Sequence, residues 1–171
     1  ILRCLVGSEM CIRDSLNKRS IISVDTETSS LDPQEAELIG ISLSYAKNVS
    51  FYIPVAHKNT KNLNKVFVLE KLKPILEDPS IKKVGQNIKY DFIILKKYGV
   101  ELNSVEDTML LSYTLDAGNN RHNMDTLSEL HLNHKTISYK DLVGSGKKQL
   151  KFSEVDIAVS YTHLTLPTNG C

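Results

Sequence analysis

Two carboxylates stand two residues apart at the end of an apolar run. The run is Ser20-Ile-Ile-Ser-Val-Asp-Thr-Glu-Thr28, and its acids are Asp25 and Glu27. A strand points residues i and i+2 to the same face, so these acids would stand side by side with Thr26 turned away. Carboxylates held that close repel each other unless a cation lies between them. The pattern predicts a hard divalent ion such as Mg²⁺; the alternative is an exposed strand end with solvated acids.

A third acid follows in the segment Val84-Gly-Gln-Asn-Ile-Lys-Tyr-Asp91. We expect a strand to end at Gly85 and Asn87 to cap the helix that follows. Asp91 would lie on the same helical face as Asn87 and point back toward the first two acids. Three acids that converge from a strand and a helix suit two-metal phosphodiester chemistry. In that chemistry one ion activates a water and the other stabilises the leaving oxygen.

The hydrophobic pattern predicts the elements that position these acids. A β-branched run predicts a buried strand over 20–24, and alternating residues predict a hairpin over 38–45 and 50–55. Further patterns predict helices over 66–76, 87–98 and 108–115, short strands over 81–84 and near Val105, and short helices and loops over 119–151. This order predicts an α/β fold, a mixed sheet flanked by helices, with the first strand central and its acids at an open edge of the sheet.

The two ends of the chain differ from its middle. Residues 1–15 and 159–171 closely resemble translated sequencing-adaptor sequence, so we interpret them as non-native extensions; a natural extension and tail is the alternative. The remaining segment, 16–158, is long enough for one domain. All three cysteines (Cys4, Cys11 and Cys171) lie in the excluded ends. The domain is therefore expected to have no disulfide, which fits a cytoplasmic protein.

The charge balance carries little functional information. The formal net charge is +1, so no global basic field indicates a nucleic-acid partner. No apolar stretch reaches membrane-spanning length. Lysines nevertheless cluster locally, and such clusters form either a solvated helix face or a phosphate-binding surface. They are Lys82, Lys83, Lys89, Lys96 and Lys97, and then Lys147, Lys148 and Lys151.

The two acidic motifs carry a family resemblance. Val24-Asp-Thr-Glu-Thr28 and Val84-Gly-Gln-Asn-Ile-Lys-Tyr-Asp91 resemble the first and second motifs of the proofreading 3′-5′ exonuclease domain of bacterial DNA polymerase I. The spacers Tyr52-Ile-Pro-Val-Ala-His57 and Arg121-His-Asn-Met-Asp-Thr-Leu127 are similar as well. The resemblance covers nearly all of 16–158. It implies the ribonuclease H-like fold of the DnaQ-like exonuclease superfamily.

The resemblance also implies roles for individual residues. Asp25 would bridge two divalent ions, Mg²⁺ or Mn²⁺, Glu27 would bind the ion that activates water, and Asp91 would support the second ion through water. Leu31 would wedge beside the terminal base of a single-stranded 3′ end of DNA, and Tyr139 would pack on that base. The remaining positions expected near the bound strand are Thr26, Gln86, Asn87, Tyr90 and Arg121.

The family's third motif, a tyrosine followed four residues later by an aspartate, has no match. Tyr161 is followed by Thr165, and Pro167 opposes a continuing helix. We therefore predict little or no exonuclease activity for this polypeptide, and we expect it to be without the polymerase domain of a parent enzyme. One alternative to a proofreading DNA exonuclease is an RNA exonuclease of the ribonuclease D type. The other is a non-catalytic nucleic-acid-binding module, which the intact acids oppose.

Overall fold

The structure is a computed structural model of the chain. It describes residue 16 and residues 19–47, 49–58, 60–136, 141, 143–144 and 150–155. The strands are β1 (Ile21–Thr28), β2 (Leu38–Ala46), β3 (Val49–Pro54), β4 (Lys82–Gly85) and β5 (Val105–Asp107). The helices are α2 (Lys65–Leu76), α3 (Lys89–Lys97), α4 (Thr108–Asp116), α5 (Met124–Leu132) and the short 3₁₀ helix η2 (Phe152–Glu154).

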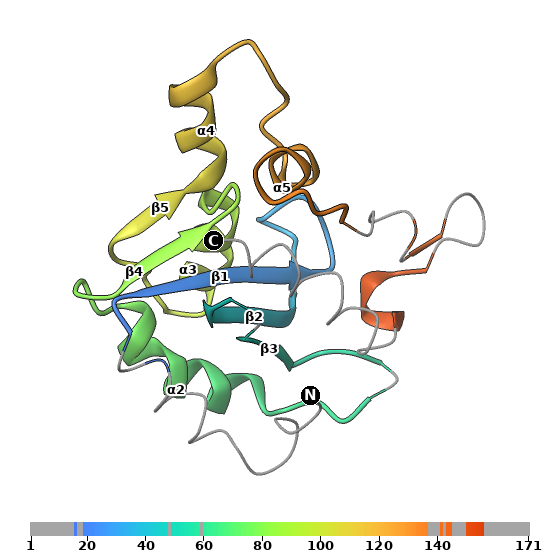
Figure 1. Cartoon of the computed structure of the whole chain (residues 1–171). Helices are drawn as coiled ribbons and strands as arrows, with labels where there is room; N and C mark the ends of the chain where they lie inside the picture. The colour runs from blue at the N-terminus through green and yellow to red at the C-terminus, as the bar shows by residue number, and fades with distance from the viewer. Residues whose placement is uncertain are drawn as a thin grey trace.

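The strands form one mixed sheet in the order β3-β2-β1-β4-β5 (Figure 1). β1 and β3 pair antiparallel with β2, whereas β1–β4 and β4–β5 are parallel pairs. This confirms the predicted mixed sheet with the first strand in the centre, and the predicted hairpin is β2–β3. β1 runs past its predicted end at residue 24, so Asp25 and Glu27 lie inside the strand and not after it.

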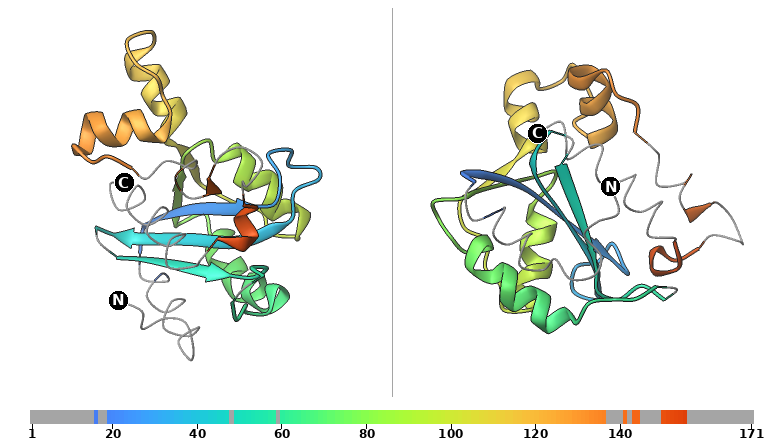
Figure 2. Two further views of the ribbon diagram at one scale, coloured as in Figure 1. Left: turned by 90° about the vertical axis from the view of Figure 1, so that its right-hand side faces the viewer. Right: turned by 60° about the horizontal axis from the view of Figure 1, so that its bottom comes forward.

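The two faces of the sheet differ because side chains alternate along each strand. Ile22 and Val24 belong to the apolar core that α2 and α3 share with the sheet. Figure 2 shows these two helices on one side of the sheet and η2 on the other. In the strand register, the opposite face carries small or polar residues: Ser23, Asp25 and Glu27 on β1 with their partners Ser44, Ser42 and Gly40 on β2.

β1 and β4 part halfway along β1. Their pairing ends at Ser23 and Val84, and β4 itself ends at Gly85. A Cβ atom on Gly85 would lie 2.9 Å from the Val24 carbonyl oxygen and 3.0 Å from Ile88 Cγ1, so a side chain does not fit there. Residues 25–28 of β1 therefore pair with β2 while their other edge is open.

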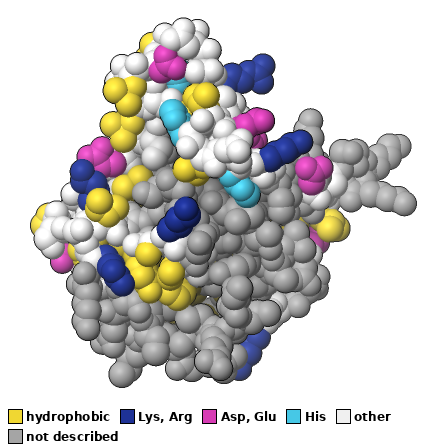
Figure 3. All heavy atoms as spheres, viewed as in Figure 1, with side chains coloured by type: hydrophobic (Ala, Val, Ile, Leu, Met, Phe, Trp, Pro, Cys, Tyr) yellow, Lys and Arg dark blue, Asp and Glu magenta, His cyan; other side chains and the backbone are white. Residues whose placement is uncertain are grey.

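The α4–α5 pair projects from the β5 edge of the sheet (Figure 1). α4 buries none of its residues, and α5 buries Ser128. Hydrophobic side chains accordingly lie on the surface of this part of the molecule (Figure 3), and the exposed ones are Leu110, Leu111, Tyr113, Leu115, Leu130 and Leu132. None of the helices in the described ranges is long and apolar enough to cross a membrane.

Gly85→Ala tests whether the parting of β1 and β4 depends on close backbone contact. The added methyl group must displace either the Val24 carbonyl or Ile88. We expect the free energy of unfolding to fall by about 1–3 kcal/mol, which is typical of overpacking. Urea denaturation measures this value. An unfolding free energy within about 0.5 kcal/mol of the parent's would show that the strands tolerate a wider separation.

Candidate active site

Asp91 links α3 to the open edge of β1. One of its carboxylate oxygens, Oδ1, accepts hydrogen bonds from the Thr26 backbone N–H at 2.7 Å and from the Thr26 hydroxyl at 2.6 Å. β4 has already left β1 at this point, so Asp91 satisfies a strand N–H that would otherwise be buried without a partner. Thr26 points away from Asp25 and Glu27, as predicted, and toward α3.

Asp25 and Glu27 lie on the polar face of the sheet beside a buried tyrosine. Glu27 is opposite Gly40, and a Cβ atom on Gly40 would lie 2.1 Å from the Tyr52 hydroxyl oxygen. Glycine at this position therefore leaves room for the Tyr52 hydroxyl. That hydroxyl shares a 2.6 Å hydrogen bond with His57 Nε2. Burial and the charges of Glu27 and Asp25 raise the pKa of the Tyr52 hydroxyl, which places it near both carboxylates.

Burial, and for Glu27 and Asp91 also neighbouring charges, disfavours ionisation of the three carboxylates. Burial raises the pKa of Asp25 from its ordinary value of 3.8 to about 6. The pKa of Glu27 is raised well above its ordinary range by burial and by the charges of Asp25 and Asp91. Burial and the charge of Asp25 also raise the pKa of Asp91, against the opposing effect of the Thr26 hydrogen bonds. The site therefore favours a positive charge among its carboxylates.

A cavity of about 490 Å³ opens beside these acids. It is lined by eight of the residues predicted for the site: Asp25, Thr26, Glu27, Leu31, Gln86, Asn87, Tyr90 and Asp91. Thr28, Ser29 and Ser30 also line it and were not predicted, although they directly follow the first acidic motif. Leu31 is 95% exposed at the rim, where an apolar side chain is available to contact a ligand.

Tyr90 joins α3 to the loop that follows β1. Its hydroxyl lies 2.5 Å from the Thr28 hydroxyl and donates a 2.5 Å hydrogen bond to the Ser30 carbonyl. The hydroxyl thus shapes the wall of the cavity through contacts within the protein. A role of its ring toward a bound strand stays a prediction.

Gln86 and Asn87 hold the backbone around the site. The Gln86 amide accepts from the Thr108 hydroxyl at 2.6 Å and donates to the His122 carbonyl at 2.7 Å. The prediction that Asn87 caps the helix after β4 is wrong, because that helix, α3, begins at Lys89 with Ile88 at the cap position. Asn87 has a left-handed backbone (φ 54°), and its N–H donates to Asp107 Oδ1 at 3.0 Å. This conformation turns the chain sharply from β4 into α3.

Of the remaining predicted residues, Arg121 does not line the cavity. Arg121 is exposed in the connection between α4 and α5, next to the His122 carbonyl that Gln86 binds. Tyr139 lies outside the described residues. Their proposed contacts with a nucleic-acid strand stay predictions.

Most lysines of the first cluster have partners within the protein. Lys83 is fully buried and donates to the carbonyls of Asp78 and Ile81, each at 2.6 Å. Lys82 pairs with Glu106 at 2.8 Å, and Lys96 lies 3.5 Å from Glu101. These contacts favour structural roles over a phosphate-binding surface. Of the second cluster, Lys147 and Lys148 lie outside the described residues.

The donor set fits a hard divalent ion in part. Carboxylate oxygens are the ligands that Mg²⁺ and Mn²⁺ prefer, and the mutual repulsion of the three acids would be relieved by such an ion. Among the described residues, no three Asp, Glu, His or Cys side chains already converge as a complete ion-binding group. Asp25 and Glu27 are suited to direct contact, whereas Thr26 already occupies one oxygen of Asp91.

Solved structures define the class of this fold. A Pol1 structure from M. smegmatis with DNA primer-template and dNTP matches 96% of this chain and 24% of its own, with a TM-score of 0.67 and 17% identity. Brucella melitensis NrnC matches 90% of this chain and 70% of its own, with a TM-score of 0.66 and 18% identity. A Mg²⁺-bound form of NrnC also matches, with a TM-score of 0.58, 19% identity and 90% and 84% coverage. The fold is that of the ribonuclease H-like exonucleases, as predicted.

Sequence comparison identifies the family. The family model described as 3′-5′ exonuclease matches residues 5–163, so the chain belongs to this family. DNA polymerase I of Rhizobium leguminosarum is 43% identical over 176 aligned residues, which cover 91% of this chain. The chain spans 17% of the length of that relative. It therefore aligns with a short part of that relative.

The raised carboxylate pKa values predict an inverse dependence of stability on pH without metal. An acid whose pKa is higher in the folded state stabilises the fold below its ordinary pKa and loses that contribution as the pH rises through the folded value. For Asp25 the change from 3.8 to about 6 corresponds to at most about 3 kcal/mol. Asp25→Asn should therefore unfold at higher urea concentration than the parent at pH 8, with the difference shrinking toward pH 4.

The control is Glu35→Gln, which removes an exposed carboxylate from the loop after β1. It should follow the parent at every pH. Equal pH profiles for Asp25→Asn and the parent would contradict the electrostatic description of the site.

Proposed function

We propose that this chain derives from the proofreading domain of a cytoplasmic bacterial DNA polymerase I. The intact domain would hydrolyse the 3′-terminal phosphodiester bond of DNA and release nucleoside monophosphates. The observation that carries the proposal is a single cavity lined by Asp25, Glu27 and Asp91 and, at its rim, by the exposed Leu31. Membership of the 3′-5′ exonuclease family and the similarity to DNA polymerase I support it.

The residues of the cavity divide into two groups by chemistry. Asp25 and Glu27 would hold divalent ions directly, and Asp91 would do so through water while it keeps β1 and α3 together. Two bound Mg²⁺ or Mn²⁺ ions would activate a water and stabilise the leaving oxygen. Leu31 would contact the terminal base, an apolar contact that suits any base and hence a proofreader. Magnesium bound to the similarly folded NrnC supports this choice of ion.

We infer that the family's third acidic motif is missing from the given sequence. The sequence after Phe152 contains no tyrosine followed four residues later by an aspartate. A cavity of about 330 Å³ between the sheet and the α4–α5 pair supports this inference. It is lined by Asp25 and by apolar side chains such as Leu111, Leu115 and Leu127. An amphipathic helix seated there would bury these side chains and bring a fourth carboxylate to Asp25.

Two other functions can be distinguished from the proposed one by their substrate and by their binding of divalent ions. A ribonuclease D-type enzyme would trim RNA in preference to DNA. A non-catalytic module would bind nucleic acid without a divalent ion. Burial and the charges of neighbouring acids raise the pKa values of Glu27 and Asp91, which favours an ion site over the second alternative.

The activity of the proposed domain can be restored by design. We would replace residues 159–171 with a helix that carries a tyrosine and, four residues later, an aspartate. With Mn²⁺ and a 3′-labelled single-stranded DNA, the parent chain should release nucleotides slowly or not at all. The repaired chain should be faster by at least about 10²-fold, because a charged ligand of the ion has been regained.

Asp25→Ala in the repaired chain is the matched control and should abolish the gained activity. An RNA oligonucleotide of the same sequence distinguishes the ribonuclease alternative. A repaired chain that is folded but inactive on both substrates would contradict the nuclease proposal. Rapid hydrolysis of DNA by the unmodified chain would contradict the inference that the missing third motif is needed for activity.

A further inference from the structure

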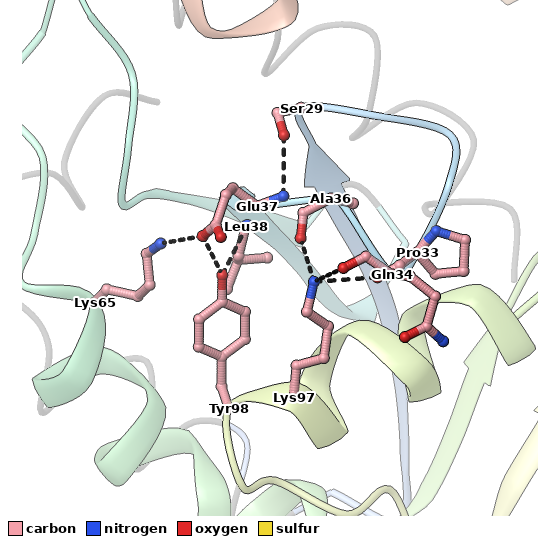
Figure 4. Close-up of polar contacts among 9 residues, drawn as sticks. All are labelled: Ser29, Pro33, Gln34, Ala36, Glu37, Leu38, Lys65, Lys97 and Tyr98. Atoms are coloured by element: carbon pink, nitrogen blue, oxygen red, sulfur yellow. Dashed lines mark hydrogen bonds and ion pairs between the residues drawn. The ribbon is translucent and has the colours of Figure 1, made fainter.

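The last turn of α3 binds the loop between β1 and β2. Lys97 Nζ donates hydrogen bonds to the carbonyl oxygens of Pro33 at 3.1 Å, Gln34 at 2.9 Å and Ala36 at 2.7 Å (Figure 4). An ammonium group has three donors, and all three are used here. This lysine is therefore directed at the loop backbone and has no donor left for a phosphate.

The residue next to Lys97 holds the end of the same loop. The Tyr98 hydroxyl donates to Glu37 Oε2 at 2.8 Å and accepts from the Leu38 N–H at 3.2 Å (Figure 4). Lys65 of α2 lies 3.6 Å from the same Glu37 oxygen. The hydrogen bond from Tyr98 is the main reason that the pKa of Glu37 is lowered. The point at which the loop enters β2 is thus held by two helices.

The loop closes on itself at its base. The Ser29 N–H donates to the Glu37 carbonyl at 3.0 Å, and the Glu37 N–H donates to the Ser29 hydroxyl at 2.9 Å. Beyond this closure, Tyr90 at the start of α3 holds Ser30, and Lys97 at its end holds residues 33–36. Leu31 projects between these two attachments into solvent at the rim of the cavity. Side chains of α3 therefore hold the loop on both sides of Leu31.

We propose that Lys97 is a positioning residue for substrate binding, acting through the loop of residues 29–37. Without the ammonium group, three carbonyl groups lose their donor and the part of the loop beyond Leu31 is released from α3. Leu31 then no longer presents a fixed apolar surface to the terminal base of a single-stranded 3′ end. This inference rests on the proposed function, because it concerns how the same cavity holds DNA.

Four variants test the inference. Lys97→Met keeps the aliphatic chain and removes the donors, and Lys97→Arg restores donors with a different geometry. Lys96→Met is the matched control, since Lys96 lies on the same turn but faces Phe92 and Glu101. Leu31→Ala removes the side chain that the loop presents.

Two measurements separate the loop from the DNA. Hydrogen exchange of the free protein reports the opening of residues 30–36. Titration of an oligonucleotide with 2-aminopurine as its 3′-terminal base, with Ca²⁺ in place of Mg²⁺, reports both affinity and unstacking of that base. In Lys97→Met, exchange in the loop should accelerate by about tenfold or more. Affinity should fall about five- to tenfold, with a smaller fluorescence change, as in Leu31→Ala.

Lys97→Arg should recover part of both effects, and Lys96→Met should match the parent. Unchanged hydrogen exchange of residues 30–36 in Lys97→Met would overturn the claim that Lys97 holds the loop on α3. Faster exchange with the parent's affinity and fluorescence would overturn the positioning role. A parent protein that does not bind the oligonucleotide at all would instead contradict the proposed function, which keeps the two failures distinct.

Discussion

The structure depends on the carboxylate of Asp91, which accepts a backbone hydrogen bond from β1 where no neighbouring strand can accept it. Where β4 turns away from β1, the Thr26 N–H loses its neighbour in the sheet, and Asp91 accepts from it. This contact joins the second acidic motif to the first and fixes the start of α3 against the centre of the sheet. The positions of Tyr90 and Lys97 follow, because both lie on the same short helix. The site walls are thus arranged around a single hydrogen-bonded pair.

This arrangement makes the ionised forms of the carboxylates costly. Asp25 and Glu27 are buried on a face with small partners such as Ser42 and Gly40, so their charged forms lose much of their contact with water. Their raised pKa values express this cost. A divalent ion bound between the carboxylates would offset this cost; without one, the charged carboxylates lower the stability of the fold at neutral pH. Such local destabilisation is common at functional sites.

The sequence was informative where local pattern decides the outcome. Alternation predicted the β2–β3 hairpin, and the i, i+2 spacing placed Asp25 and Glu27 on one face. Asn87 shows the limit: its residue type suits a helix cap, but the turn out of β4 needs a left-handed residue, and Asn adopts that conformation too. Lys97 was grouped with surface lysines because nothing local reveals three carbonyl groups some sixty residues earlier in the chain. Contacts between distant segments are absent from any local pattern.

The central claim is that the open edge of β1 forms a cation site, and diffraction from crystals soaked in Mn²⁺ tests it most directly. We expect an anomalous peak within about 2.0–2.3 Å of carboxylate oxygens of both Asp25 and Glu27. The Thr26–Asp91 hydrogen bonds should persist beside the ion. Crystals at saturating Mn²⁺ that showed no peak at these carboxylates, while other surface sites were occupied, would contradict a cation site here.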